Sequence, residues 1–214
     1  MKDILDQFRL GHHDFDSGKL EGFEGLDPYD LFELWAKEAI NNKELEPNAF
    51  VLSTVNSNGQ PSSRVLYLKD IIKKQFVFYT NYKSKKGEEI AGNSKVSMLF
   101  FWPDSSRQIR IEGVCTRVDS QISDDYFNSR PRGSKIGAWA SHQSDELTGR
   151  DELEHRVKMY EEEFKNEVPR PGHWGGYQIE PLSFEFWQGR PSRLHDRIIF
   201  TSSKGLWDIY KQNP

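Results

Sequence analysis

The feature that most constrains the fold of this chain is a series of short segments rich in β-branched and aromatic residues, separated by polar turns. The turn at 56–59 ends in glycine and predicts a hairpin between its neighbours. In a later segment Ile109 and Ile111 share one face and polar residues share the other, as in a strand with one buried face. Short strands at close spacing predict a mainly antiparallel barrel or closed sheet. The expected strands are 50–55, 64–69, 75–80, 96–102, 108–118, 176–187, 197–202 and 206–210.

Helices are expected at the edges of this sheet. Asp27 is a good N-cap residue, and Pro28 suits the first position of a helix that we expect to end near Asn42. The sequence therefore predicts a mainly β fold with peripheral helices. We expect residues 1–26 to form a leader and residues 27–214 to form a single domain. The other expected helices are 84–91, 119–128 and 151–165.

Charge is unevenly distributed along the 214 residues. The net charge is −4, but residues 1–63 carry −7, residues 64–110 carry +6 and residues 111–214 carry −3. A basic middle in an acidic chain predicts a bound anion, and its size favours one or two phosphate groups over a polymer. Solvated lysines that discourage strand pairing at a sheet edge are one alternative. A nucleic-acid-binding module is another, and it rests on this segment alone.

Several common cofactor and metal patterns are missing from the sequence. It contains no GxGxxG, no GxxxxGK[ST] and no HExxH, so we expect no metal site. The one cysteine, Cys115, excludes an internal disulfide, and we expect a buried thiol on the face of Ile109. No segment has the apolar length of a membrane span, and acidic residues occupy the start, where a signal peptide would be apolar. We therefore expect a soluble, cytoplasmic protein.

Three kinds of segment carry cations in arrangements that suit anion binding. One begins with Arg64 and ends with Lys69, which a strand would point to opposite faces, where they could serve two different anions. At 79–87, hydroxyls and lysines lead into a helix whose free N–H groups complete a cradle for a monophosphate, although a strand exit with surface lysines would look similar. At 129–134 and 187–197, cations lie among prolines and glycines, which favours binding loops. These residues alone predict a planar, phosphate-bearing ligand in a β-barrel.

At these segments the sequence resembles the pyridoxine 5′-phosphate oxidase family, FMN-dependent enzymes that make pyridoxal 5′-phosphate. The resemblance implies FMN as cofactor, an antiparallel FMN-binding split β-barrel, and a homodimer with FMN at the subunit interface. It also implies that O₂ oxidises pyridoxine 5′-phosphate or pyridoxamine 5′-phosphate with release of H₂O₂, with no nucleic-acid or membrane partner. The blocks that carry it are RVLYLK (64–69), FYTNYKSKKG (78–87), SRPRGSKIGAW (129–139), HQS (142–144), HWGGYQIEPLSFEFWQG (173–189) and RLHDR (193–197).

The resemblance also implies roles for individual residues. Arg193 and His195 would lie over the pyridine ring as the catalytic pair, and Arg197 and Gln108 would be donors to the flavin ring. The implied FMN contacts are Arg64, Val65, Leu66, Tyr67, Leu68, Lys69, Tyr79, Thr80, Lys85, Lys86, Gln108, Gln143, Ser144, Trp187 and Arg197, with Tyr79, Thr80, Lys85 and Lys86 on its phosphate side. The implied substrate contacts are Lys69, Tyr126, Arg130, Ser134, Arg193 and His195. Plain core packing is the alternative for Trp187 and Tyr126.

The chain departs from the family pattern at both ends. The run from His13 to Phe15 stands where the family has Arg-x-Tyr, and the run from Lys211 to Pro214 stands where it has Arg-Leu-x-Pro. Lysine cannot reproduce the bidentate contact of arginine, so we expect an effect on lid closure and tail docking, but not on FMN binding. These departures motivate an alternative, a non-catalytic flavin- or vitamer-binding protein on the same barrel. A related split-barrel reductase is a further alternative, disfavoured by the vitamer-binding pattern.

Overall fold

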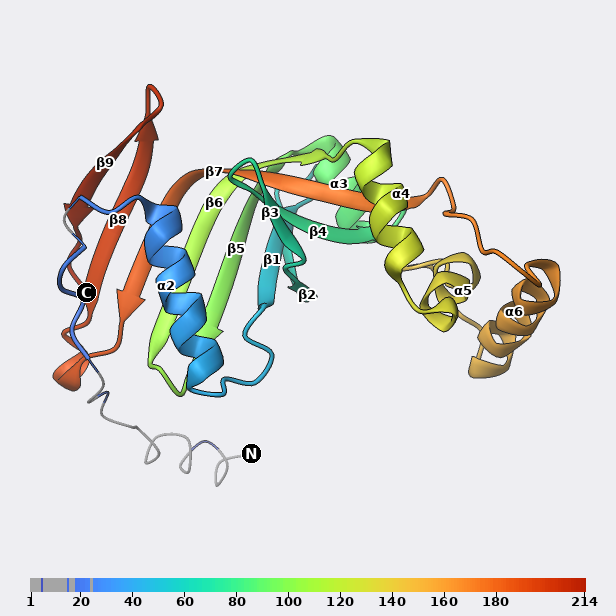
Figure 1. Ribbon diagram of the computed structural model, residues 1–214, viewed down its shortest axis with the longest axis horizontal. Coiled ribbons are helices and arrows are strands. Elements are labelled where there is room, and N and C mark those ends of the chain that lie inside the picture. The colour runs from blue at the N-terminus through green and yellow to red at the C-terminus, as the bar shows by residue number, and fades with distance from the viewer. Residues whose placement is uncertain (1–4, 6–14, 16–17, 24) are drawn as a thin grey trace. The chain divides into compact units, whose positions relative to one another are not determined.

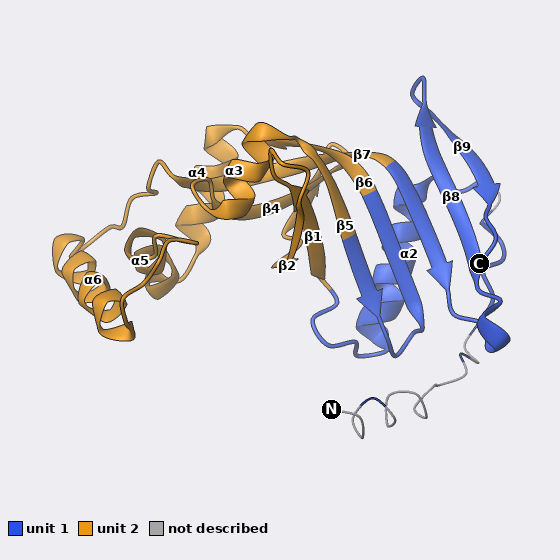
Figure 2. Cartoon of the chain, turned by 180° about the vertical axis from the view of Figure 1, so that it is seen from behind, with its two compact units in different colours: residues 1–47, 99–111, 183–214 blue, residues 48–98, 112–182 orange. Residues whose placement is uncertain are grey.

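The computed structural model describes residues 5, 15, 18–23 and 25–214. They fall into two compact units (Figure 2). Unit 1 comprises the described residues within 1–47, with Leu99–Ile111 and Ser183–Pro214, and unit 2 comprises Asn48–Met98 and Glu112–Leu182. Strands β5 (Lys95–Trp102), β6 (Arg107–Arg117) and β7 (Trp174–Gln188) each contribute residues to both units. The expectation of a single domain over 27–214 stays a prediction.

One sheet contains all the strands of the described residues (Figure 1). Its order is β2-β1-β5-β6-β7-β4-β3, with β8 paired to β7 and β9 paired to β8. The pairs β1–β2, β3–β4, β4–β7, β7–β8 and β8–β9 are antiparallel. The prediction of a mainly antiparallel β fold with peripheral helices is thus confirmed. The remaining strands are β1 (Ala49–Val55), β2 (Pro61–Tyr67), β3 (Asp70–Ile72), β4 (Gln75–Asn81), β8 (Asp196–Ser203) and β9 (Leu206–Lys211).

The expected hairpin forms between β1 and β2, but β2 lies three residues earlier than its expected start at Arg64. Pairing explains the difference, because Pro61 lies opposite Val55 in the register and extends the ladder down to the turn. β2 ends at Tyr67, so strand alternation does not reach Lys69. The alternation argument for the direction of the Lys69 side chain is therefore corrected.

Helix α2 (Pro28–Asn41) confirms the first expected helix, with the Asp27 side chain accepting a hydrogen bond from the Tyr29 N–H at 2.9 Å. In unit 1 its apolar face packs on the sheet through aromatic rings. Phe32 meets Phe100 with ring centroids 5.3 Å apart, and Trp35 meets Phe186 at the same distance. Edge-to-face ring contacts of this kind add to the stability gained by burying apolar area.

The described residues of unit 2 form four helices, α3 (Lys85–Gly92), α4 (Ser120–Ser129), α5 (Arg132–Ala140) and α6 (Arg150–Glu163), of which α6 packs on α5. α5 was not predicted, because 129–134 reads as a loop. The helix begins directly after Pro131, whose fixed φ suits a helix start, while Gly133 and Gly137 lower its local propensity. Burial of Ile136 on its inner face compensates for that low propensity.

The core is rich in aromatic residues, as expected from the 28 Phe, Tyr and Trp of the sequence. Phe50, Phe76 and Phe78 are almost completely buried in unit 2, as Phe184 is in unit 1. Cys115 is buried, as expected, and burial raises the pKa of its thiol far above the usual range. Among the helices of the described residues, none combines the length and apolarity needed to cross a membrane.

Candidate active site

A first cavity of about 420 Å³ opens in unit 2 between β2 and the start of α3. We call it the Lys86 cavity. Its walls are residues 62–66 of β2, Lys85 and Lys86 of α3, and Gln143 and Ser144 from the loop after α5. Three of the segments that the sequence resemblance tied to FMN, at 64–69, 79–86 and 143–144, therefore meet here.

Lys86 is a buried cation with 6% of its surface exposed. Its Nζ donates to Thr80 Oγ1 at 3.2 Å, Ser84 Oγ at 3.0 Å and Gln143 Oε1 at 3.1 Å. Within the described part of the chain, none of its hydrogen-bond partners is a carboxylate. Burial and the nearby Arg64 charge lower the pKa of Lys86 to about 8. A buried ammonium group with neutral partners is suited to an anionic ligand as its counter-charge.

Local sequence places α3 so that its first residues line this cavity. Ser84 caps the helix by accepting from the Gly87 N–H. Gly87 is required by close packing, because a Cβ there would lie 2.2 Å from the Tyr82 carbonyl oxygen. The Lys85 N–H donates to Ser144 Oγ at 3.1 Å, which ties the helix start to the loop after α5. The hydroxyls and lysines expected at 79–87 therefore come together in unit 2, but the Lys85 and Gly87 N–H groups are not free, because Ser144 and Ser84 accept hydrogen bonds from them.

Arg64 lines the Lys86 cavity and is held from behind by a buried carboxylate. Its Nη1 donates to Leu52 O at 3.1 Å and Thr54 Oγ1 at 2.6 Å, and its Nη2 donates to Ser62 Oγ at 2.6 Å. Nη2 also contacts Glu89 Oε2 at 3.3 Å. Thr54 and Ser62 in turn donate to Glu89 at 2.5 and 2.8 Å. Burial opposes ionisation of Glu89, but these hydrogen bonds and the Arg64 charge hold its pKa below the usual value.

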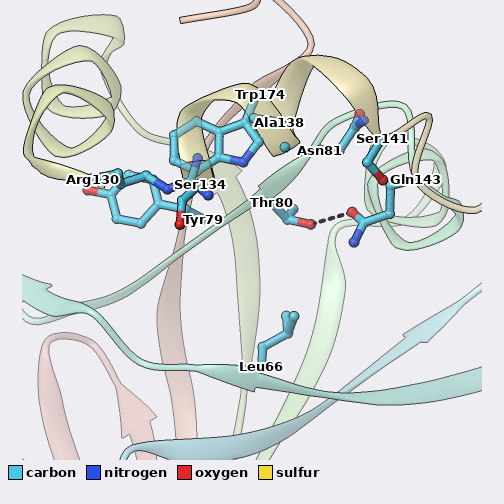
Figure 3. A pocket seen from close by; sticks show the side chains of 11 residues that line it. Leu66, Tyr79, Thr80, Asn81, Arg130, Ser134, Ala138, Ser141, Gln143 and Trp174 are labelled. Atoms are coloured by element: carbon cyan, nitrogen blue, oxygen red, sulfur yellow. Dashed lines mark hydrogen bonds between the residues drawn. The ribbon is translucent and has the colours of Figure 1, made fainter. Parts of the chain in front are cut away.

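A second cavity, of about 340 Å³, lies beside the first (Figure 3). We call it the Arg130 cavity. Leu66 and Gln143 line both cavities. The other walls of the Arg130 cavity come from β4, from residues 130–141 and from the start of β7 at Trp174.

Arg130 lies against aromatic rings. Its Cζ is 4.4 Å from the Trp174 ring centroid and 5.5 Å from that of Phe127. Its Nη1 is buried and, among the described residues, has no hydrogen-bond partner. Burial lowers the pKa of the guanidinium, which nevertheless stays charged near neutral pH. A buried donor without a partner is uncommon in folded proteins and marks this cavity as a site for an anionic group.

Tyr79, Tyr126 and Trp174 form what we call the aromatic stack. The Tyr79 and Tyr126 centroids are 3.8 Å apart with planes 10° apart, and Trp174 is 5.6 Å from Tyr79 and 6.2 Å from Tyr126. Burial and Tyr126 raise the pKa of Tyr79 to about 12. The stack places Tyr79 beside the Arg130 cavity, whereas the sequence resemblance associated it with the FMN phosphate.

Unit 1 holds the remaining predicted residues. Trp187 packs on His195 with ring centroids 4.6 Å apart. The Arg190 N–H donates to His195 Nδ1 at 3.1 Å, so a neutral His195 ring carries its proton on Nε2. Burial and the Arg193 charge lower the pKa of His195, which favours that neutral form at pH 7. Phe15 contacts both the Trp187 and His195 rings, at 5.6 and 5.7 Å.

Arg197 in unit 1 is fixed by a buried carboxylate. Its Nε and Nη2 donate to the two oxygens of Glu185 at 2.9 and 3.0 Å. Its Nη1 donates to Asn213 O at 2.9 Å, and its own carbonyl accepts from the Gln212 N–H at 3.0 Å. The tail therefore docks on Arg197 despite its departure from the family pattern. His13, at the other departure, lies outside the described residues.

The structure thus brings part of the predicted set together. The predicted residues that line the Lys86 cavity are Arg64, Val65, Leu66, Lys85, Lys86, Gln143 and Ser144. Those that line the Arg130 cavity are Leu66, Tyr79, Thr80, Arg130, Ser134 and Gln143. Tyr126 joins the second through the aromatic stack. Tyr67 and Lys69 are exposed near the end of β2, with Lys69 Nζ 5.1 Å from the Tyr67 ring, and Leu68 is half-buried. Gln108, Trp187, Arg193, His195 and Arg197 belong to unit 1.

Sequence reasoning missed Trp174 and Glu89. Trp174 lies inside a quoted block, but a tryptophan at the start of a strand is usually a core residue. Glu89 follows Lys86 by three residues, a spacing that places both on one side of a helix. That spacing was the available signal for a carboxylate near the lysine.

Comparisons with known proteins agree over nearly the whole chain. Residues 36–162 match the family model described as pyridoxamine 5′-phosphate oxidase, and residues 174–214 match the pyridoxine 5′-phosphate oxidase C-terminal dimerisation region. The chain is 50% identical over 190 residues to a pyridoxine/pyridoxamine 5′-phosphate oxidase of Cytophaga hutchinsonii, covering 87% of this chain and 88% of the relative. It is 49% identical over 189 residues to that of Cupriavidus necator, covering 88% and 89%.

Solved structures agree on the fold. PhzG of Burkholderia lata, in complex with tetrahydrophenazine-1-carboxylic acid, superposes with a TM-score of 0.87 at 28% identity, over 94% of this chain and 100% of PhzG. A pyridoxamine 5′-phosphate oxidase-related, FMN-binding protein of Nostoc punctiforme superposes with a TM-score of 0.70 at 16% identity, over 89% of this chain and 100% of that one. The fold is the FMN-binding split barrel, as predicted.

Proposed function

Because the chain belongs to the pyridoxine/pyridoxamine 5′-phosphate oxidase family, whose cofactor is FMN, we propose that it makes pyridoxal 5′-phosphate from pyridoxine 5′-phosphate or pyridoxamine 5′-phosphate. The observation that carries this proposal is the buried, unpartnered Nη1 of the half-buried Arg130 among the described residues, together with the buried cation Lys86 in the neighbouring cavity. Two such cations in neighbouring cavities suit two phosphate groups, one from the cofactor and one from the substrate.

The proposed reaction balances with O₂ as the electron acceptor. The alcohol substrate loses two hydrogens, which reduce O₂ to H₂O₂ and leave the aldehyde. The amine substrate loses the same two hydrogens, and water then releases ammonia to leave the same aldehyde. When bound, FMN supplies a two-electron acceptor that O₂ can reoxidise.

The residues of unit 2 have proposed roles in holding the two phosphates. Lys86, with Lys85 and Arg64 beside it, would hold the phosphate of FMN by charge-assisted hydrogen bonds. Arg130 and Ser134, with Tyr126 and Lys69 as the other predicted contacts, would hold the substrate phosphate. Fixing the phosphate orients the carbon that reacts, because a bound substrate then has few positions available.

The residues of unit 1 have proposed roles toward the rings. A neutral His195, with its proton on Nε2, can donate a hydrogen bond to the substrate, and Arg193 would close over the same ring. Arg193 has φ 62° and Ser192 φ 59°, a left-handed backbone that is costly for non-glycine residues. Arg197, Gln108 and Trp187 remain proposed FMN contacts, in a homodimer with FMN at the subunit interface.

An anaerobic titration tests the proposed function. Purified protein loaded with FMN should lose its flavin absorbance when pyridoxine 5′-phosphate is added, and should regain it with one H₂O₂ per turnover when O₂ is admitted. A protein that binds no FMN would contradict the whole proposal. A protein that binds FMN and the vitamer but shows neither bleaching nor peroxide would be the non-catalytic binding protein.

A further inference from the structure

We propose that Trp174 is a positioning residue for the substrate phosphate: its indole ring holds the Arg130 guanidinium at the second cavity and so sets a preference for phosphorylated over unphosphorylated ligands. This inference rests on the proposed function. It adds a residue to the site that the sequence resemblance did not assign.

Arg130 is held by ring faces and not by a carboxylate. Its Cζ lies 4.4 Å from the Trp174 centroid, well within the range of a cation–π contact, and the Phe127 ring is more distant at 5.5 Å. Among the described residues Arg130 has no ion-pair partner, and its Nη1 has no hydrogen bond. Figure 3 shows Arg130 and Trp174 gathered with Tyr79 at one side of the cavity.

Trp174 is itself fixed on all sides, with 7% of its surface exposed. The backbone N–H of Trp174 donates to Pro171 O at 3.0 Å, and its backbone carbonyl accepts from Arg170 Nη1 at 2.7 Å. Arg170 also forms an ion pair with Asp124 of α4 at 2.6 Å, and α4 ends at Ser129, directly before Arg130. The backbone of Trp174 is therefore tied, through Arg170, to the helix that leads directly into Arg130.

The aromatic stack fixes the plane of the indole. The Tyr79 and Tyr126 rings lie 9° and 5° from the Trp174 plane. Gly176, opposite Tyr79 in the β4–β7 register, leaves room for this arrangement, because a Cβ there would lie 2.9 Å from the Tyr79 ring. A ring locked in this way presents a constant face to Arg130.

The type of contact matters for the ligand. A carboxylate that held Arg130 would consume its N–H donors and neutralise its charge. An indole face attracts the guanidinium through the ring quadrupole and leaves both the donors and the charge available. The arrangement therefore orients Arg130 without lowering its capacity to bind phosphate.

The test measures ligand binding without turnover, on the FMN-loaded protein. Pyridoxal 5′-phosphate and pyridoxal are titrated separately, and binding is followed by the change in flavin absorbance. We expect Trp174→Leu to lower the affinity for pyridoxal 5′-phosphate by about tenfold and the affinity for pyridoxal by less than about twofold. A cation–π contact in a desolvated site is of that strength. Trp174→Phe keeps a ring and should stay within about threefold of the parent protein.

Controls separate positioning from general damage. Trp139→Leu removes an indole that packs on Tyr160 and Phe164 instead, and it should change neither ligand. Adding Trp174→Leu to Arg130→Gln should produce no further loss of pyridoxal 5′-phosphate binding if the ring acts through the guanidinium. If Trp174→Leu does not fold, Trp174→Met, which has no ring but adapts to the space, completes the same cycle with Arg130→Gln.

The outcomes distinguish this inference from the proposed function. A parent protein that binds both ligands equally well would overturn the role of Arg130 and with it the proposed function. A parent that prefers pyridoxal 5′-phosphate while Trp174→Leu keeps that preference would overturn this inference alone. Equal weakening of both ligands by Trp174→Leu would also overturn it, because the ring would then serve only the packing.

Discussion

The two cavities of unit 2 hold their cations in opposite ways. Lys86 is surrounded by oxygen atoms of Thr80, Ser84 and Gln143, at 3.0 to 3.2 Å. Arg130 is surrounded by ring faces and keeps an unpartnered Nη1 among the described residues. Among the described residues, no carboxylate hydrogen-bonds to Lys86 or Arg130 themselves, whereas Arg64 at the Lys86 cavity pairs with Glu89.

The difference shows that a cation with no carboxylate bonded to it can be of two kinds. It can be a lysine, which loses its proton as the pH rises, or an arginine, which stays charged. Lys86 has its hydrogen bonds satisfied and lacks only a counter-charge, and burial together with Arg64 brings its pKa down to about 8. It can therefore lose its proton in mildly alkaline solution. Arg130 keeps its charge but leaves a donor unused. The Lys86 cavity should respond to pH, and the Arg130 cavity should not.

The largest expected effect is at Arg130. Arg130→Gln should lower kcat/KM for pyridoxine 5′-phosphate by about 100-fold, because a buried charge-assisted contact to phosphate contributes about 1.5–3 kcal/mol. Steady-state peroxide release measures this, and FMN affinity should stay unchanged. Arg130→Lys should recover only part of the loss, since an ammonium cannot reproduce the fork of a guanidinium. Full activity of Arg130→Gln would show that the Arg130 guanidinium does not bind the substrate phosphate.

A smaller effect is expected at Lys86. Lys86→Met should lower the affinity for FMN by about 30-fold. The affinity for riboflavin, which has no phosphate, should stay within about twofold of the parent value. Flavin fluorescence quenching gives both dissociation constants. Lys95→Met removes an exposed lysine of β5 and serves as the control. Equal weakening of FMN and riboflavin would mean that Lys86 supports the packing of the cavity and not the phosphate.

The comparison also predicts a difference in pH dependence. The protonated form of Lys86 binds phosphate, and its pKa is lowered to about 8 by burial and Arg64. FMN affinity should therefore be near its maximum at pH 7, begin to fall as the pH approaches 8, and fall by up to about tenfold per pH unit above it, as the ammonium loses its proton. Riboflavin affinity and the preference for pyridoxal 5′-phosphate should stay level between pH 7 and 9. A level FMN profile would show that Lys86 does not titrate in this range.

The smallest effect concerns Glu89, which does not line the Lys86 cavity but is the buried partner of Arg64, one of the residues that do. Burial and Arg64 lower the pKa of Lys86, and the Glu89 carboxylate opposes them. Glu89→Gln should therefore move the break in the FMN profile to lower pH, by less than about one unit, because one partly screened charge is removed. Glu88→Gln removes an exposed charge one residue away in α3 and should leave the break in place. A shift to higher pH in Glu89→Gln would reverse the assigned sign.

Local sequence predicted much of the fold because its signals are local. The cap at Asp27 and the alternation in β6 each depend on a few neighbouring residues. α5 escaped prediction because its stability comes from burial of Ile136 and not from propensity. The lysines at the start of α3 were predicted because the cradle pattern is contiguous in the chain.

The parts of the site that were missed depend on contacts between distant segments. Glu89 is a buried carboxylate only because Thr54, Ser62 and Arg64 arrive from β1 and β2 to satisfy it. Trp174 is a partner of Arg130 only because β7 begins beside α4. Neither relation appears in the spacing of residues along the sequence.

Leu66 and Gln143 contribute to the walls of both cavities, so only the thickness of a side chain separates the two compartments. A molecule bound in one cavity would therefore form part of the wall of the other. Bound FMN would complete the Arg130 cavity, and affinity for the substrate would then depend on whether FMN binds first.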